Sequence, residues 1–406
     1  MPVGRPQVPC LQSVSLGTLS ILPTGHSNIS RKTGEKFGVR QASTLFTDEV
    51  AAVDELLEQL HTNPDVVFCF VSPDFDLEIQ GPMLAAAFPT ADVVGATTSG
   101  QIGNSGYEPT GMTAASLCGT ESTIQFLVSP LSSLATDMGM LTSHISAHLS
   151  TIPRNKHAFG FLLCDGLSMM EERLIAALYA GAGEMPIVGG SAGDNLAFER
   201  THVLHDGKFH KNSAVLSVVV SPVPFGTLTV THHVPTAQRM VITRADPQKR
   251  LVHEINGRPA AEVYAEMVGK TVEELGPDVF SRNPVMLCAN GSNYTRGIMQ
   301  IQEGGIIRFA CAIETGLVLR LAKPTRIMES LRQAFDANEA EVGVPDVILG
   351  FDCILRRLEF ESLGISDEVG DFLAEHHVVG FSTYGEQLHG VHVNQTFVGI
   401  ALRGER

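Results

Sequence analysis

The chain has 406 residues, of which 44% are hydrophobic and 18% are charged, and its formal net charge is −16. These values are typical of two or three well-buried globular domains. The acidic sequence contains no long basic block, which argues against a nucleic-acid or anionic-lipid surface. No apolar run approaches the ~18 residues of a membrane span, so no contact with a membrane is expected.

Seven cysteines are scattered along the chain, and no two of them form a CxxC pair. This usage is typical of a reducing compartment and disfavours a structural zinc site. Polar residues interrupt the N-terminal stretch LQSVSLGTLSIL, which argues against a secretory signal peptide. We therefore expect a cytoplasmic protein in which residues 1–37 form a separate N-terminal segment.

An amphipathic helix is predicted at residues 47–60, where Val50, Val53, Leu57 and Leu60 share one face. The strand-like run DVVFCFVSPDFD (65–76) follows. It leads through an apolar, helix-like stretch to a second strand and a glycine-rich turn, DVVGATTSGQI (92–102). The 28 residues from Val66 to Val94 match the ~30 that a strand–helix–strand crossover needs.

The same order of elements recurs twice along the chain. AFGFLLCDG (158–166) leads to SMMEERLIAALYAG (168–181) and then to PIVGGSAGDN (186–195). DVILGFDC (346–353) leads to SDEVGDFLAEHH (366–377) and then to VVGFSTYGEQ (378–387). A further strand-like run follows each turn. We predict an α/β fold of mixed sheets with helical layers, built from three repeated strand–helix–strand–turn units.

A domain boundary is predicted near Pro235 to Arg239, after the last strand of the second unit. It divides the chain into residues 38–236 and residues 237–406.

The stretch GGSAG (189–193) matches G-x-S-x-G, the nucleophile elbow of α/β-hydrolases, which would make Ser191 a nucleophile. That motif needs a helix directly after the serine, whereas a loop-like, polar segment follows here. The other two turns place Thr97 and Ser382 at the matching position without the full motif. We therefore interpret Ser191 as a feature of the fold and keep an acyl hydrolase as an alternative.

Two histidines near the C-terminus, His389 and His392, are the candidate ligand residues. Strand alternation places His392 and Asn394 on one face, with Val391 on the other. A neutral imidazole on an inner sheet face can bind haem iron or another metal, and it can equally form a hydrogen bond in the core. Spacing alone leaves both roles open. No CxxCH motif is present, so any haem would be bound non-covalently.

The repeated turns, GGSAGD, VILGFDCILRR and the closing GFSTYGEQLHGVHVNQTFVGIAL together resemble FIST-domain proteins, which have N- and C-terminal FIST halves. The resemblance covers about residues 38–402. FIST domains are regarded as sensory or ligand-binding modules, so the resemblance implies a signalling protein and not an enzyme. The ending is similar to a stand-alone subgroup, the bacterial nitric-oxide-sensing haem proteins called NosP.

This finer resemblance implies a haem-based nitric oxide sensor that holds haem b through His392, with His389 as the second choice of axial ligand. It also implies that the signal passes to a separate protein, either a sensor histidine kinase or a diguanylate cyclase or phosphodiesterase of cyclic-di-GMP signalling. Whether the protein forms a homo-oligomer is left open.

The alternative within the family is a module that binds a small metabolite such as an amino acid. In that case Tyr384, Glu386, Arg296 and Asp194 would form the site instead of the histidines.

Overall fold

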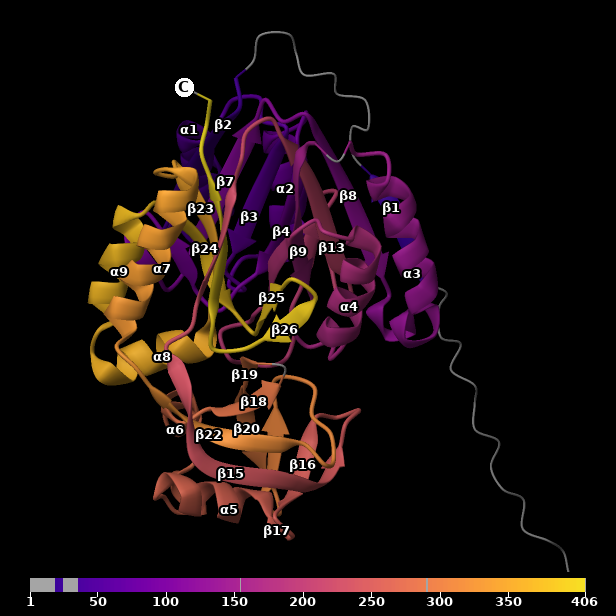
Figure 1. Ribbon diagram of the computed structural model, residues 1–406. Helices are drawn as coiled ribbons and strands as arrows, with labels where there is room; N and C mark the ends of the chain where they lie inside the picture. The colour runs from indigo at the N-terminus through magenta and orange to yellow at the C-terminus, as the bar shows by residue number, and fades with distance from the viewer. Residues whose placement is uncertain (1–18, 25–35, 154, 290, 406) are drawn as a thin grey trace, which may run out of the picture.

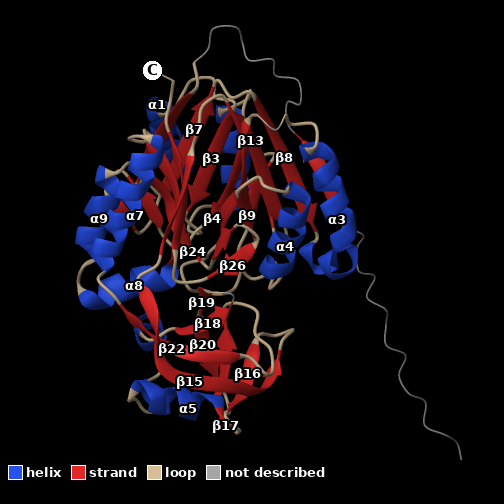
Figure 2. Cartoon of the chain, viewed as in Figure 1, coloured by secondary structure: helices blue, strands red, loops and turns tan. Residues whose placement is uncertain are grey.

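The computed structural model describes residues 19–24, 36–153, 155–289 and 291–405 (Figure 1). An upper body contains three mixed β-sheets with helices packed outside them, and a smaller lower body is built on a fourth sheet (Figure 2). The α/β class with mixed sheets that the sequence predicts is confirmed. Within the described residues, no helix is both long and apolar enough to cross a membrane.

The first sheet has the strand order β12-β11-β4-β3-β7-β2. Its strands are β2 (Gly38–Thr44), β3 (Val66–Val71), β4 (Asp92–Thr97), β7 (Met112–Cys118), β11 (Val203–His205) and β12 (Lys208–His210). Helices α1 (Glu49–Gln59) and α2 (Leu77–Ala87) accompany it. The apolar run VVFCFV forms β3, which is buried along its whole length and pairs in parallel with β4. The Asp48 carboxylate starts α1 by accepting the Ala51 N–H at 2.9 Å.

The second sheet has the order β1-β8-β13-β9-β10-β25-β26. Its strands are β1 (Ser20–Thr24), β8 (Ser122–Ser129), β9 (His157–Cys164), β10 (Ile187–Ser191), β13 (Ala214–Ser221), β25 (Glu386–Leu388) and β26 (Val391–Val393). The short helix η1 (Leu131–Ser133) leads into α3 (Leu134–Leu149), which packs against α4 (Glu171–Ala182). The parallel pair β9–β10 is the second predicted crossover.

The third sheet has the order β14-β27-β23-β24-β5-β6. Its strands are β5 (Gln101–Gly103), β6 (Gly106–Glu108), β14 (Gly226–Val230), β23 (Val347–Cys353), β24 (Val378–Thr383) and β27 (Phe397–Leu402). The helices are α7 (Ile327–Val342), α8 (Ile354–Leu363) and α9 (Ser366–Glu375). The sequence predicts α9 at its observed start, but it misses α8. Helix α8 follows β23 directly and has no side-chain cap, so no capping residue signals where it begins.

All three sheets have the same internal order, and each takes its outer hairpin from another unit. The hairpin β5–β6 follows the first turn and joins the third sheet, β11–β12 follows the second turn and joins the first sheet, and β25–β26 follows the third turn and joins the second sheet. Backbone hydrogen bonds also link the turns, from Ser99 N to Ser382 O at 3.0 Å and from Ser191 N to Gly385 O at 2.8 Å. The three sheets are therefore interlocked.

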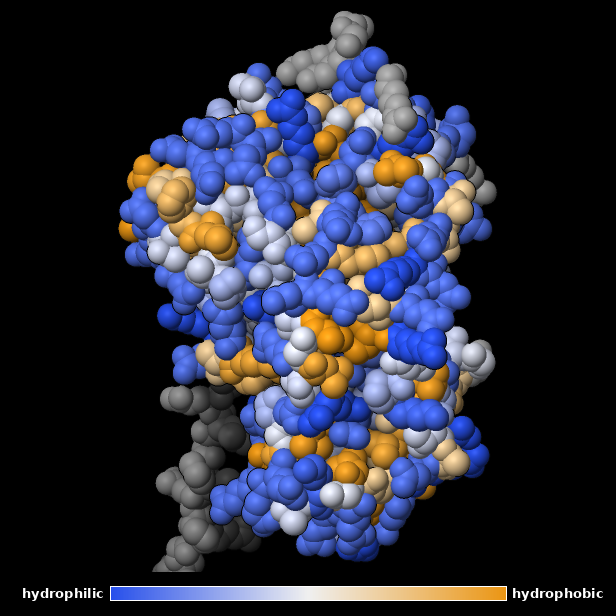
Figure 3. All heavy atoms as spheres, turned by 90° about the vertical axis from the view of Figure 1, so that its left-hand side faces the viewer, coloured by the Kyte–Doolittle hydropathy of each residue, from blue (hydrophilic) through white to orange (hydrophobic). Residues whose placement is uncertain are grey.

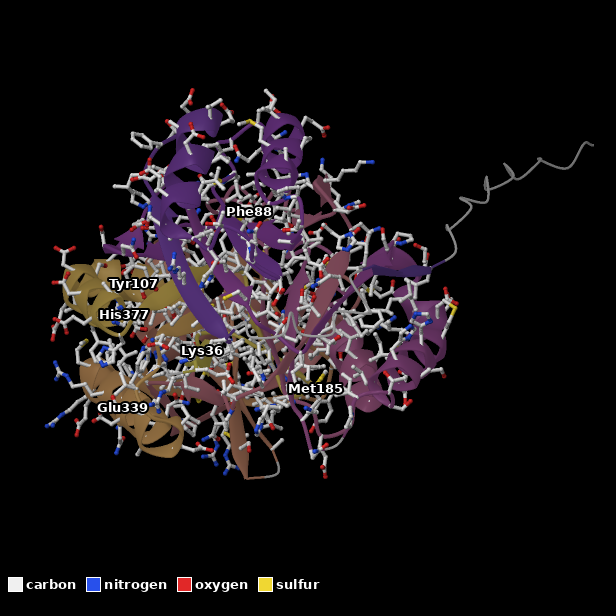
Figure 4. The ribbon with its side chains drawn as sticks, turned by 90° about the horizontal axis from the view of Figure 1, so that it is seen from above. Lys36, Phe88, Tyr107, Met185, Glu339 and His377 are labelled. Atoms are coloured by element: carbon white, nitrogen blue, oxygen red, sulfur yellow. The ribbon has the colours of Figure 1, made fainter. Side chains whose placement is uncertain are left out.

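The view from above shows three helical lobes around a common centre (Figure 4). Phe88, Met185 and Glu339 mark one lobe each, and Tyr107 of the exchanged hairpin β5–β6 lies in the same lobe as His377. Phenylalanines of all three sheets meet at the centre, where the ring centroids of Phe161 lie 4.2 Å from Phe68 and 4.9 Å from Phe351. Each buried phenylalanine contributes about 2–3 kcal/mol of apolar burial, so this shared core holds the three sheets together.

Residues 233–324 form the lower body. Its strands are β15 (His233–Asp246), β16 (Leu251–Ile255), β17 (Arg258–Pro259), β18 (Val285–Ala289), β19 (Ser292–Arg296), β20 (Ile298–Gln302), β21 (Ile306–Phe309) and β22 (Val318–Pro324). Helix α5 (Ala260–Val268), the short helix η2 (Val272–Glu274) and helix α6 (Pro277–Arg282) complete it. It has an apolar core of its own.

The chain enters the lower body after β14 and returns to the upper body at α7 (Figure 1). The predicted boundary after residue 236 lies inside β15. In a side view, apolar groups are exposed near the junction of the two bodies, among mainly hydrophilic side chains (Figure 3).

Candidate functional site

The three exchanged hairpins can be compared position by position, because each pairs with the equivalent glycine of a parallel strand. Gly380 pairs with Ile102, Gly95 with Leu204 and Gly189 with Gln387. Across each hairpin, these three residues pair in turn with Tyr107, Phe209 and His392. Two hairpins thus carry an aliphatic–aromatic pair where the third carries glutamine and histidine. The fold does not need a polar pair at this position, which marks His392 as a candidate functional residue.

The His392 imidazole is 1% exposed and only partly paired. Its Nδ1 lies 3.4 Å from Gln387 Nε2, which donates a shorter hydrogen bond, 2.9 Å, to Ser191 Oγ. Its Nε2 is buried and has no hydrogen-bond partner among the described residues. Burial lowers the pKa of His392 below its ordinary value. The ring is therefore neutral at pH 7. With Gln387 donating to Nδ1, the unpartnered Nε2 carries the proton and can donate to a ligand.

Gly385 makes room for this imidazole at the entrance of the third hairpin. A Cβ atom at this position would lie 2.3 Å from His392 Cε1 and 2.8 Å from its Nε2. It would also lie 2.9 Å from Asn394 Nδ2, so His392 and Asn394 meet beside the Gly385 backbone. The sequence prediction that both side chains share one face is consistent with this contact.

Two further buried donors near His392 lack partners among the described residues, Asn394 Nδ2 and Arg296 Nε. The Asn394 carbonyl oxygen accepts the backbone N–H of Gly297 at 3.1 Å, which links β26 to the lower body. Arg296 is one residue from this contact, and its positive charge lowers the pKa of His392. The unpartnered atoms therefore gather where the third hairpin meets the lower body. Buried polar atoms normally have partners, so this cluster is a candidate binding site.

An ion cluster closes the other side of the site. Arg250 of the lower body donates to Glu171 at 2.5 Å and to Glu172 at 2.7 Å, at the start of α4. Glu172 also accepts the backbone N–H of Ala312 at 2.5 Å. The negative charges of both glutamates raise the pKa of His392, against the larger effect of burial. A ligand at His392 would therefore lie beside the charged contact between the two bodies.

His389 occupies a different environment. It lies in the two-residue turn of the third hairpin, in a left-handed conformation (φ 44°). Its backbone N–H donates to Ile187 O at 3.0 Å. Burial also lowers the pKa of its imidazole. The side chain belongs to the hairpin tip and not to the Gln387–His392 pair, which favours His392 as the ligand residue.

Ser191 lies at the end of β10 and is fully buried. Its hydroxyl accepts from Gln387 and contacts Cys164 Sγ at 3.3 Å. Among the described residues, no imidazole or carboxylate lies within hydrogen-bonding distance of this hydroxyl to act as a general base. The geometry therefore does not support an acyl hydrolase.

The residues named for a metabolite site are not all together. Tyr384 donates to Asp194, and Asp194 also accepts the N–H groups of residues 198–200 at 2.8–2.9 Å, so it organises a loop. Glu386 is buried and accepts the Thr396 hydroxyl at 2.7 Å. Burial raises the pKa of Glu386 to about 8. Of the four residues, Arg296 is the one whose charge affects the pKa of His392.

A second buried cluster contains a potential metal-ligand set, His232, His233 and Glu359. The guanidinium of Arg356 donates to His232 Nδ1 at 2.8 Å, so the proton of this neutral ring is on Nε2, which donates to Glu359 at 2.7 Å. Asp352 balances the arginine at 2.5 Å. A metal would need the Nε2 lone pair that this proton occupies. The cluster is therefore better described as a buried ion network.

The sequence named His392, Asn394 and Arg296, but it missed Gln387 and the two residues that join the bodies, Glu172 and Arg250. An alignment of the three hairpins would have found Gln387, since each hairpin places the paired residues five positions apart. Glu172 looks like an ordinary acidic residue of a first helical turn. Arg250 is distant in sequence from everything that it contacts, and no local signal marks it.

Comparisons with known proteins agree with the family resemblance. The FIST N domain matches residues 65–258, and the FIST C domain matches residues 260–389. An uncharacterised protein of Methanocaldococcus jannaschii is 24% identical over 251 residues, which cover 53% of this chain and 48% of that protein. The match therefore spans about half the length of this relative. A chorismatase crystal structure aligns with 90% of this chain and 98% of its own, at 8% identity and a TM-score of 0.32, too low to support a shared fold.

Proposed function

This chain belongs to the FIST-domain family, and from that premise we propose that it is a sensory protein that binds a small molecule at the His392 site. The observation that carries this proposal is the Gln387–His392 pair. It replaces an aliphatic–aromatic pair at an otherwise equivalent position and leaves a neutral, buried nitrogen without a partner. An unsatisfied buried polar atom costs about 1–3 kcal/mol, and a ligand that pairs with it would offset this cost.

Haem b is the first ligand that we propose. The donor set can accommodate this group, because His392 Nε2 has no hydrogen-bond partner and Arg296 Nε could pair with a propionate. To bind iron, the imidazole would carry its proton on Nδ1, at the cost of the weak 3.4 Å contact from Gln387 Nε2. A bound haem would supply an iron that binds nitric oxide. The chain would hold and orient it through His392, with His389 as the second choice. The output would pass to a separate histidine kinase or cyclic-di-GMP enzyme.

A second candidate ligand is a small polar metabolite such as an amino acid. The unpartnered Asn394 Nδ2 and Arg296 Nε could donate to a carboxylate, and the glutamates at the start of α4 could attract an ammonium group. The charged groups beside His392 are consistent with such a ligand. The two candidates differ in colour and in size, so one series of measurements separates them.

The test is a hemin titration of the full chain, followed by reduction and addition of nitric oxide. A saturable one-to-one Soret band that shifts with nitric oxide, and that is lost in His392→Phe but kept in His389→Ala, is the result expected for a haem sensor. Phenylalanine suits this position, because Phe209 occupies the equivalent one. A broad, non-saturable band rejects haem.

Amino acids and small carboxylic acids are then screened by thermal shift. A ligand that raises the unfolding temperature of the wild type, but not of Arg296→Met, supports the metabolite. If neither hemin nor any metabolite responds to changes at His392 or Arg296, the proposed binding site is wrong. Ser191→Ala serves as a control that removes a neighbouring polar group without changing either residue.

A further inference from the structure

The lower body differs in charge from the rest of the protein. Residues 233–324 contain 11 lysines and arginines and 9 aspartates and glutamates, although the whole chain has a net charge of −16. More than half of these acidic residues lie on the helical side, in α5, η2 and α6: Glu262, Glu266, Glu273, Glu274 and Asp278. The sheet of the lower body is therefore a basic region of an acidic protein.

Two strands of this sheet present a mixed basic and apolar strip. In the register of β15 and β22, Arg239 lies opposite Arg320 and Val241 lies opposite Val318. The intervening pair, Met240 and Leu319, points into the core. Val241 is 37% exposed and Val318 is 47% exposed, so the outer face of this strand pair is open (Figure 1). We call these four outer residues the β15–β22 strip.

The two arginines of the strip face each other without compensation. Like charges directly opposite in a sheet are unfavourable. Four other arginines of the lower body have carboxylate partners, among them Arg244 with Glu254 at 2.9 Å and Arg258 with Glu266 at 2.6 Å, whereas Arg296 and Arg308 have none among the described residues. Among the described residues, no ion pair involves either arginine of the strip. An anionic partner would relieve this repulsion and cover the valine pair.

We propose that the β15–β22 strip docks an acidic protein surface, that of the signalling protein that receives the output of this sensor. The inference rests on the proposed sensory function. Beside Arg239 lies a groove of about 310 Å³ whose lining includes Met267 and the ion pair of Arg258 with Glu266. The partner is expected to present carboxylates around an apolar side chain. Nucleic acid is a poorer fit, because the strip has no aromatic side chain for stacking and the chain as a whole repels polyanions.

The test uses a fluorescent peptide of alternating glutamate and leucine as the probe, and the full chain as the receptor. The peptide is expected to bind, and its affinity is expected to fall as the salt concentration is raised. Arg239→Glu/Arg320→Glu should weaken peptide binding about tenfold, as expected for the reversal of one exposed and one half-buried charge. Arg326→Glu/Arg332→Glu is the matched control, since it makes the same change of charge on exposed arginines of α7 and the residue before it.

Equal losses in the two double variants, or no binding at all, would overturn the proposal. Binding of a single-stranded oligonucleotide or of anionic vesicles, lost in the strip variant and not in the control, would instead show that the strip recognises polyanions in general. Ligand binding at His392 is measured in the same variants. If it is normal while the peptide fails to bind, the docking surface is wrong and the sensory function stands.

Discussion

The most informative perturbation is to give the third hairpin the pair that the first sheet carries, by Gln387→Leu together with His392→Phe. The wild-type pair leaves two buried polar atoms without partners, His392 Nε2 and Gln387 Oε1. Each costs about 1–3 kcal/mol. The change removes both, but it also removes the hydrogen bond from Gln387 to Ser191, worth about 1 kcal/mol. We expect the ligand-free protein to become more stable by at least about 1 kcal/mol and ligand binding to be lost.

Thermal unfolding measures the first effect, and the hemin and metabolite titrations measure the second. A gain of about 1 kcal/mol corresponds to a rise of about 2–4 °C for a unit of this size. The reciprocal control is Leu204→Gln together with Phe209→His, which should destabilise the first sheet without creating ligand binding. If the hairpin variant instead loses more than about 2 kcal/mol, the Gln387–His392 pair is structural, and the reasoning from the three equivalent hairpins fails.

Three other changes test the surroundings of the site. Burial lowers the pKa of His232 from 6.5 to about 4, so its contribution to stability is present above pH 6.5 and is lost as the pH falls to about 4. His232→Gln should remove this part of the pH dependence of the unfolding free energy, roughly 3 kcal/mol in total, and so flatten a pH series of unfolding temperatures. An unchanged series would contradict the assignment. Arg250→Met leaves two glutamates uncompensated at the junction of the two bodies and should cost about 3–5 kcal/mol, seen as faster hydrogen exchange there; unchanged exchange would reject the ion cluster as a clamp. Gly385→Ala should displace the His392 ring, and the loss in binding free energy should be at least as large as the loss in unfolding free energy. Gly276→Ala, where a Cβ meets nothing within 4 Å, should leave binding unchanged.

Local sequence patterns determined much of the architecture. The apolar runs that begin each unit are long enough to form buried strands, and their spacing fits a single crossover, so β3, β9 and β23 each pair in parallel with the next strand of their unit. The same reasoning predicted the turns that follow β4, β10 and β24. Strand alternation also placed His392 and Asn394 on one face, and both are buried. These features depend on the period of the chain over a few residues, which a single sequence contains.

Only the tertiary structure decided which units exchange hairpins and what surrounds His392. The glutamates at the start of α4 and Arg250 reach this histidine from distant parts of the chain, through pairings between sheets and through the placement of the lower body. Hydrophobic periodicity fixes which face of a strand is buried, but it does not specify which element covers that face. The partners are selected by the packing of the complete core, because many sheet edges offer the same backbone hydrogen bonds and only the sum of long-range contacts distinguishes them.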